Sequence, residues 1–265
     1  MKKKIIFSLA LILLIIFKVM GEENEITVSG TGSNEGIVKE LAEAFMKESP
    51  GTIINVPPSI GTDGGINGCK EGKFELGRIG RPLKDTEKNL GLSELLFCKM
   101  PVVIIVNENV KIKNLSTKQI CDIFAGKITN WKEVGGEDKK IYVVSRDPGE
   151  SSLVEIQKRL EGFKDIAVTD KAILTHKDPE MIEKVGGKDG AIGFGVSANM
   201  KGRKVNMLSL DDIGITSDKY KILVTVGLVY MNELTGLAKR FVDYIFSGKG
   251  AEIIKKNYCI PLQRQ

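Results

Sequence analysis

The stretch EITVSGTGSNEGIVKELAEAFMK, residues 25–47, predicts a strand, a turn and a helix in direct succession. Glu25–Ser29 reads as the strand, and the turn that follows it, Ser29–Ser33, contains only Ser, Thr and Gly. The apolar residues of the segment 36–47 recur at the spacing of an amphipathic helix: Ile37, Leu41, Ala42 and Phe45. A strand that passes through a short turn into a helix is the basic unit of an α/β fold.

Strand-like and helix-like segments alternate along the rest of the chain. The segment PVVIIVN, residues 101–107, is almost wholly apolar and β-branched, which is typical of a strand buried on both faces. Further strands are expected at 52–56, 74–77, 141–145 and 220–230, and further helices at 64–71, 116–124, 152–160 and 234–246. This alternation predicts an α/β protein, and the lack of a low-complexity linker favours lobes that pack together.

Length and composition are those of a globular protein. The chain has 265 residues, of which 42% are apolar and 28% charged, so intrinsic disorder is excluded. The net charge of +5 includes four lysines within the first 20 residues, and the rest of the chain is close to neutral. Charge therefore gives no reason to expect a nucleic-acid partner.

The N-terminus has the pattern of an export signal. Lys2, Lys3 and Lys4 precede an apolar run from Ile5 to Phe17, which spans roughly 20 Å as a helix and falls short of the ~30 Å hydrocarbon core of a bilayer. We expect a secretory signal peptide over residues 1–21, and hence export to the periplasm or to the outer face of the cytoplasmic membrane. Because Lys18 and Met20 suit a cleavage site poorly, an uncleaved anchor stays an alternative.

The sequence lacks the usual signs of a metal or cofactor site and of an enzyme. The four cysteines match no zinc pattern, which leaves buried thiols and a single disulfide both open: Cys69, Cys98, Cys121 and Cys259. His176, the only histidine, is expected in a solvated loop or at a helix end. A loose GxGxxA at Gly193–Ala198 has no clear strand before it, so a nucleotide cofactor is not expected. We assign no catalytic residue, metal or cofactor.

Three turns share one design, in which small and hydroxyl-bearing residues join a strand to a helix: residues 29–33, 61–66 and 145–152. A helix N-terminus exposes unpaired N–H groups and carries partial positive charge, and small residues let an anion approach it. Arg146 in the third turn adds a guanidinium that can bind two oxygens. Each turn alone is explained by helix capping, but the three together with Arg146 predict a converging site for an oxyanion.

The order of these motifs resembles the phosphate-binding proteins of bacterial phosphate ABC transporters. The resemblance covers nearly all of the chain after the signal segment and includes SGTGS, GTDGGI, ELGRIGRPL, VVSRDPGESS, GAIGFG and above all IFAGKITNWKEVGG. It implies a two-lobed α/β fold, like that of periplasmic binding proteins, with two crossing hinge strands and the ligand between the lobes. Lobe one would comprise residues 22–104 and 226–265, and lobe two residues 105–225.

The same resemblance implies a set of ligand-binding positions. In the first two turns these are Thr31, Gly32, Ser33 and Thr62, and in the third they are Arg146, Ser151 and Ser152. Two positions depart from the family pattern: Gly80 stands where some members carry an Asp acceptor, and Glu150 stands where a hydroxyl is expected. A carboxylate at Glu150 could take over the acceptor role and favour protonated phosphate over sulfate.

The expected function is a non-enzymatic, monomeric receptor that captures inorganic phosphate and passes it to the membrane permease of an ABC importer. Three alternatives stay open at this stage. The first is a receptor for another tetrahedral oxyanion, such as sulfate or a molybdate-like ion. The others are a secreted phosphatase, which would need a nucleophile with a base or metal, and an adhesion module on the same fold.

Overall fold

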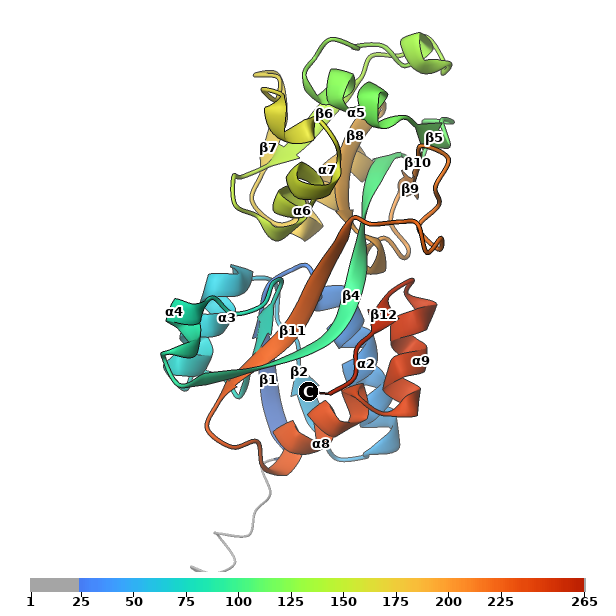
Figure 1. Ribbon diagram of the computed structural model, residues 1–265. Helices are drawn as coiled ribbons and strands as arrows, with labels where there is room; N and C mark the ends of the chain where they lie inside the picture. Colours follow the sequence, from blue (N-terminus) through green and yellow to red (C-terminus); the bar gives the residue numbers. More distant parts are fainter. Residues whose placement is uncertain (1–23, 265) are drawn as a thin grey trace, which may run out of the picture.

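The protein has two α/β lobes joined by two long strands, as Figure 1 shows, and this confirms the fold class expected from the sequence. The computed structural model describes residues 24–264, so the signal peptide expected over residues 1–21 lies outside the described part. Within 24–264, no helix combines the length and the apolar character needed to cross a membrane.

The first lobe, at the bottom of Figure 1, is built on a parallel sheet in which β1 lies between β2 and β3. Helix α2 buries the apolar stripe predicted for it, including Ile37, Leu41 and Phe45. The elements in chain order are β1 (Glu25–Gly30), α2 (Glu35–Glu48), β2 (Ile53–Asn55), α3 (Gly61–Lys70), β3 (Leu76–Ile79) and the short α4 (Asp85–Lys88).

The two connecting strands are β4 (Leu92–Asn107) and β11 (Leu223–Met231). Strand β4 pairs antiparallel with β11 from Leu92 to Pro101 and then with β8 (Ala191–Val196) from Val102 to Val106. The change of partner marks where β4 leaves the first lobe and enters the second. Residues 101–107 are all buried, as the run of β-branched residues predicted, because strands and helices cover both of their faces.

The second lobe, at the top of Figure 1, has a sheet in which β6 lies between β8 and β7, both of them parallel to it. Trp131 and Phe124 are fully buried packing residues, and the Trp131 indole N–H donates to the Gly190 carbonyl at 3.0 Å. The elements are β5 (Asn114–Leu115), α5 (Thr117–Phe124), η1 (Trp131–Val134), β6 (Tyr142–Arg146), α6 (Ser151–Arg159), η2 (Phe163–Asp165), β7 (Ile173–Thr175), α7 (Asp178–Gly187), β8, η3 (Ser197–Asn199), β9 (Val205–Met207) and β10 (Ser209–Leu210).

After β11 the chain stays in the first lobe. Helices α8 (Gly236–Ile245) and α9 (Gly248–Lys256) pack against α2, and β12 (Ile260–Pro261) adds an edge to β4. Phe45 of α2 contacts Phe241 of α8 edge to face, with ring centroids 5.6 Å apart. All four cysteines are free and buried, so the disulfide alternative is not realised in this structure.

Three details of the sequence prediction were wrong. Helix α3 begins at Gly61 rather than at 64. Ile66 and Cys69 bury one face of the helix against β3, and this packing stabilises the whole helix despite the poor helix propensity of its glycines. Strand β8, fully buried between β4 and β6, was not predicted, and the loose GxGxxA motif lies largely within it. Helices α7 and α9 were not anticipated, because glycines or polar residues interrupt their apolar spacing.

Candidate oxyanion site

Three helices begin where the lobes face each other, and each begins at one of the turns identified in the sequence. Helix α2 follows the turn at residues 29–33, Thr62 lies in the first turn of α3, and Ser151 is the first residue of α6. Helices α2 and α3 belong to the first lobe and α6 to the second. Their N-termini bring unpaired N–H groups and partial positive charge to the gap between the lobes.

Hydroxyl groups from both lobes meet in this gap. The Ser33 Oγ and Ser151 Oγ atoms are 3.3 Å apart, although 118 residues separate them in the sequence. Thr31 Oγ1 donates to Ser33 Oγ at 3.4 Å. A Cβ atom placed on Gly80 would lie 3.1 Å from Ser151 Oγ and 3.2 Å from Thr31 Oγ1. The structure therefore gathers three rotatable donors around the bare backbone of Gly80.

The Arg146 guanidinium lies between two carboxylates at the end of β6. Its Nη1 donates to Asp178 Oδ1 at 2.9 Å, and its Nη2 donates to Glu150 Oε2 at 2.5 Å. The Arg146 side chain is 2% exposed, and its Nε has no hydrogen-bond partner among the described residues. Ser152 Oγ donates to the same Asp178 oxygen at 3.3 Å. Asp178 thus fixes the guanidinium on one side and leaves donors for a further acceptor.

Glu150 is only partly accessible, and its environment acts on its charge in two directions. Burial raises the pKa of the Glu150 carboxyl, the Arg146 guanidinium lowers it, and the nearby Asp178 raises it again. His176, exposed at the start of α7 as expected, has its pKa raised by a hydrogen bond with Asp147. Around Arg146, the two carboxylates of Glu150 and Asp178 outnumber the one guanidinium, so these three groups carry a net negative charge when all are ionised.

The Thr31, Ser33 and Ser151 hydroxyls form a hydroxyl cluster, and Gly32 and Thr62 occupy tight positions next to it. A Cβ atom on Gly32 would lie 2.8 Å from Pro179 Cδ of the opposite lobe, so only glycine allows this approach. Thr62 Oγ1 accepts a hydrogen bond from the Gly80 N–H at 3.1 Å, and its own hydrogen stays available for donation. Both residues lie beside the cluster, as expected from the motifs.

A buried arginine that the sequence reasoning did not single out lies under the first turn. Arg78 of β3 is fully buried and donates from Nη2 to the Pro57 carbonyl at 2.9 Å. Its nearest carboxylate oxygen, on Glu35, is 3.8 Å away. Burial lowers the pKa of Arg78 to about 10, so the side chain stays charged at neutral pH. A positive charge in this position favours an anion near the start of α2.

Two further residues support the site and were missed in the sequence: Asp178, whose partners all lie in the second lobe, and Asn199, which also bonds the first lobe. Asp178 accepts from Arg146, and its second oxygen accepts from Asn199 Nδ2 at 3.2 Å. Asn199 also donates to the Gly32 carbonyl at 2.9 Å and accepts from the Gly36 N–H at 3.2 Å. Neither residue lies in one of the three turns. The only available signal was that Asp178 precedes a proline at a possible helix start.

Comparison with known proteins identifies relatives along nearly the whole chain. Residues 20–249 match the family model described as "PBP superfamily domain". The chain is 29% identical over 240 residues to the phosphate-binding protein PstS of Bacillus subtilis, covering 86% of this chain and 78% of that protein. It is 26% identical to PstS of Borreliella burgdorferi, covering 97% of both chains.

A solved structure shows the same likeness in three dimensions. It is a putative phosphate ABC transporter substrate-binding protein from Clostridium perfringens with bound phosphate, and it matches with a TM-score of 0.75 and 32% identity. The alignment covers 90% of this chain and all of the other. A phosphate transport receptor from Vibrio cholerae, 24% identical with a TM-score of 0.60, shares the fold.

Proposed function

The chain belongs to the PBP superfamily and, within it, to the substrate-binding proteins of phosphate ABC transporters, and from this premise we propose that it captures inorganic phosphate between its two lobes. It is a binding protein and not an enzyme. The observation that carries the proposal is the meeting of Thr31, Ser33 and Ser151 hydroxyls from both lobes close to Gly80.

Each residue of the site has a distinct role in this proposal. The Thr31, Ser33 and Ser151 hydroxyls, now bonded to one another, turn their hydrogens toward the phosphate oxygens when the anion enters. Gly32 and Thr62 supply a backbone N–H and a hydroxyl from the first lobe. These contacts alone do not neutralise a doubly charged anion, whose removal from water needs charge-assisted donors.

Arg146 provides that charge from the second lobe. Its Nε has no partner among the described residues and is available to the anion, while Nη1 donates to Asp178 and Nη2 to Glu150. Ser152 donates to the same Asp178 carboxylate. Glu150 keeps one oxygen on Arg146, and its other oxygen accepts a hydrogen bond from a protonated phosphate oxygen. In this arrangement Ser152 acts on the ligand through Asp178 rather than by direct contact.

We further propose that β4 and β11 form the hinge, with lobe boundaries at residues 104/105 and 225/226. The change of β4 pairing partner at Pro101–Val102 supports a boundary close to the first of these positions. A monomer of this kind would present both lobes to a membrane permease. The protein acts outside the cytoplasm, and we propose that the signal segment at residues 1–21 directs its export.

Thermal unfolding in the presence of phosphate tests the proposal. A ligand at a hundredfold excess over its dissociation constant stabilises the native state by ~2.7 kcal/mol. For a chain of this size we expect the melting temperature to rise by roughly 5–10 °C. Sodium chloride at equal ionic strength is the control for non-specific screening and should give little change. An unchanged melting temperature in millimolar phosphate would show that phosphate is not the ligand.

A further inference from the structure

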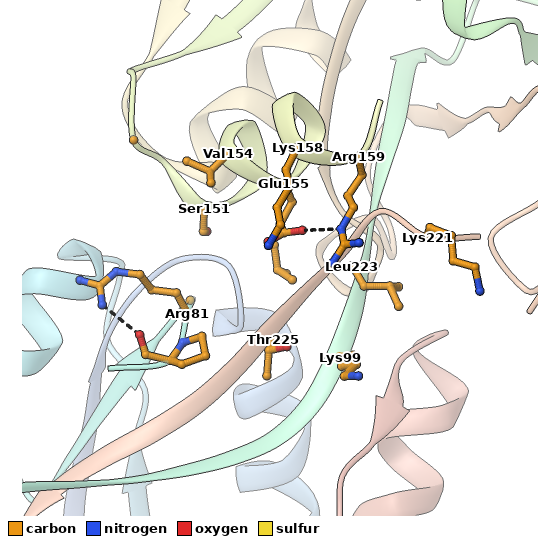
Figure 2. A pocket seen from close by; sticks show the side chains of 14 residues that line it. Arg81, Lys99, Ser151, Val154, Glu155, Lys158, Arg159, Lys221, Leu223 and Thr225 are labelled. Atoms are coloured by element: carbon orange, nitrogen blue, oxygen red, sulfur yellow. Dashed lines mark hydrogen bonds and ion pairs between the residues drawn. The ribbon is translucent and has the colours of Figure 1, made fainter. Parts of the chain in front are cut away.

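A cavity of about 530 Å³ lies directly beside the proposed site, and Gly80 and Ser151 line both of them. Figure 2 shows the side chains of α6 on one side of this cavity and those of the crossing strands, including Thr225 and Lys99, on the other. Its volume is within the range of small-molecule sites, and a single phosphate ion would fill only a small part of it. The cavity is therefore larger than the proposed ligand needs.

The cavity lining is strongly basic. Five cationic side chains line it, against one carboxylate, Glu155: Arg81, Lys99, Lys158, Arg159 and Lys221. Arg81 is paired with Glu87 at 2.7 Å, and Arg159 lies 3.5 Å from Glu155. Neither Lys99 nor Lys158 has an ion-pair partner among the described residues, and Lys221 Nζ donates only to a backbone carbonyl, at 2.9 Å. Three lysines thus leave positive charge unneutralised around one space.

Gly80 forms the boundary between the cavity and the hydroxyl cluster, and it has no side chain to close that boundary. A Cβ atom on Gly80 would lie 3.1–3.4 Å from the hydroxyls of Ser151, Thr31 and Ser33, at the centre of the hydroxyl cluster. A phosphoryl group held by these hydroxyls would therefore direct one of its oxygens past the backbone of Gly80 into the basic space. A larger residue at this position would fill that path.

From the shared boundary at Gly80 and the unpaired lysines, we infer that the protein binds condensed phosphates, with one phosphoryl group in the proposed site and a second in the basic cavity. The inference rests on the proposed function, because the terminal phosphoryl group uses the same hydroxyls and Arg146. The bridging oxygen passes Gly80, and Lys99, Lys158 and Lys221 neutralise the charge of the second phosphoryl group.

The lining favours a condensed phosphate over a nucleotide or a sugar phosphate. None of the described residues that line the cavity is aromatic, so it offers no stacking surface for a base or a sugar ring. Its dominant chemical feature is unneutralised positive charge, which suits a ligand that carries negative charge along its length.

Calorimetric titration of the wild-type protein with orthophosphate, inorganic pyrophosphate and glucose 6-phosphate tests the inference. We expect pyrophosphate to bind at least as tightly as orthophosphate and to compete with it, and glucose 6-phosphate to bind more weakly than either. In the double variant Lys99→Gln/Lys158→Gln, pyrophosphate affinity should fall by roughly five- to tenfold while orthophosphate affinity changes by less than about twofold, because only the longer ligand reaches these lysines.

The double variant Lys255→Gln/Lys256→Gln is the matched control. It removes the same charge from exposed positions on α9 and should leave the affinity for pyrophosphate unchanged. If orthophosphate binds and pyrophosphate does not compete, the inference is wrong while the proposed function stands. It is also wrong if both double variants have the same effect, or if glucose 6-phosphate binds as tightly as pyrophosphate. If orthophosphate itself does not bind, the proposed function fails and the inference fails with it.

Discussion

Arg146 owes its proposed role to the side chains that hold it. An unpaired buried guanidinium would be costly, and Asp178 offsets that cost with a bond of 2.9 Å while Glu150 adds a second carboxylate. Both acids together outweigh the single positive charge, so an anion without a proton, which places a bare oxygen against the Glu150 carboxylate, is repelled there. An anion that brings a proton can instead donate a hydrogen bond to the free oxygen of Glu150.

This balance predicts the effect of Glu150→Gln on anion selectivity. Hydrogen phosphate carries a proton at neutral pH and sulfate does not, so a carboxylate acceptor discriminates between them. Removing the negative charge should improve sulfate binding by roughly tenfold or more, about 1.4 kcal/mol, and should change phosphate binding less. Competition between the two anions, measured by calorimetry, gives both affinities in one experiment.

Asp147→Asn is the matched control for that substitution. Asp147 is three residues away and also carries a carboxylate, but that carboxylate bonds His176 and not Arg146. It should leave the ratio of phosphate to sulfate affinity near its wild-type value. If Glu150→Gln also leaves this ratio unchanged, the carboxylate does not contact the ligand.

At the scale of residues, the sequence pointed to the hydroxyls that the structure brings together, but not to the residues that support Arg146. Thr31, Ser33, Ser151 and Arg146 stand in strand–turn–helix segments, whose local chemistry indicates anion binding, and the structure brings the three hydroxyls together. Asp178 bonds Arg146 across 32 residues of sequence. Such a long-range contact has no local pattern, so sequence reasoning did not find it.

At the scale of elements, the strands and helices with a clear apolar period were predicted well. Ser116 caps α5 as expected and accepts from the Gln119 N–H at 3.2 Å. Strand β4 is much longer than the predicted segment 101–107, because its first part, Leu92–Met100, pairs with β11 and mixes buried with accessible residues, of which Ser93 and Lys99 are exposed. Only the later part is uniformly apolar, and only that part was identified.

Strand β11 contains an irregularity that positions the turn before α2. Its pairing with β4 shifts register between Val226 and Gly227. The carbonyl of Gly227 accepts a hydrogen bond at 3.1 Å from Asn34, a buried residue directly before α2. A local change of register in one connecting strand is thereby linked to the first turn of the proposed site.

We expect Gly227→Ala to destabilise the protein. A Cβ atom there would lie 2.6 Å from the Leu95 carbonyl oxygen of β4, so the backbone of the paired strands must shift. Overpacking of this kind costs about 1–3 kcal/mol, measurable as a lower midpoint of urea unfolding. Gly248→Ala is the control, since nothing lies within 4 Å of its Cβ position. Equal stability of the Gly227→Ala variant and the wild type would show that the register shift tolerates a side chain.

At the scale of the whole molecule, the lobes are held together by polar contacts at the edges of the site. Asn199 of the second lobe bonds the backbone of the α2 turn, and Lys177 Nζ donates to the Ser59 carbonyl at 2.8 Å. The Ser33–Ser151 contact also joins the lobes, so the proposed site draws on both of them. Binding should therefore depend on the second lobe as strongly as on the first.

Equilibrium dialysis of radiolabelled phosphate against the wild-type protein and the Arg146→Ala variant is the most direct test of this account. We expect one phosphate per wild-type chain, and an affinity lower by ~2–5 kcal/mol in the variant, the range for breaking a buried charge pair. Equal affinity in both proteins, or no saturable binding to the wild type at millimolar phosphate, would contradict it.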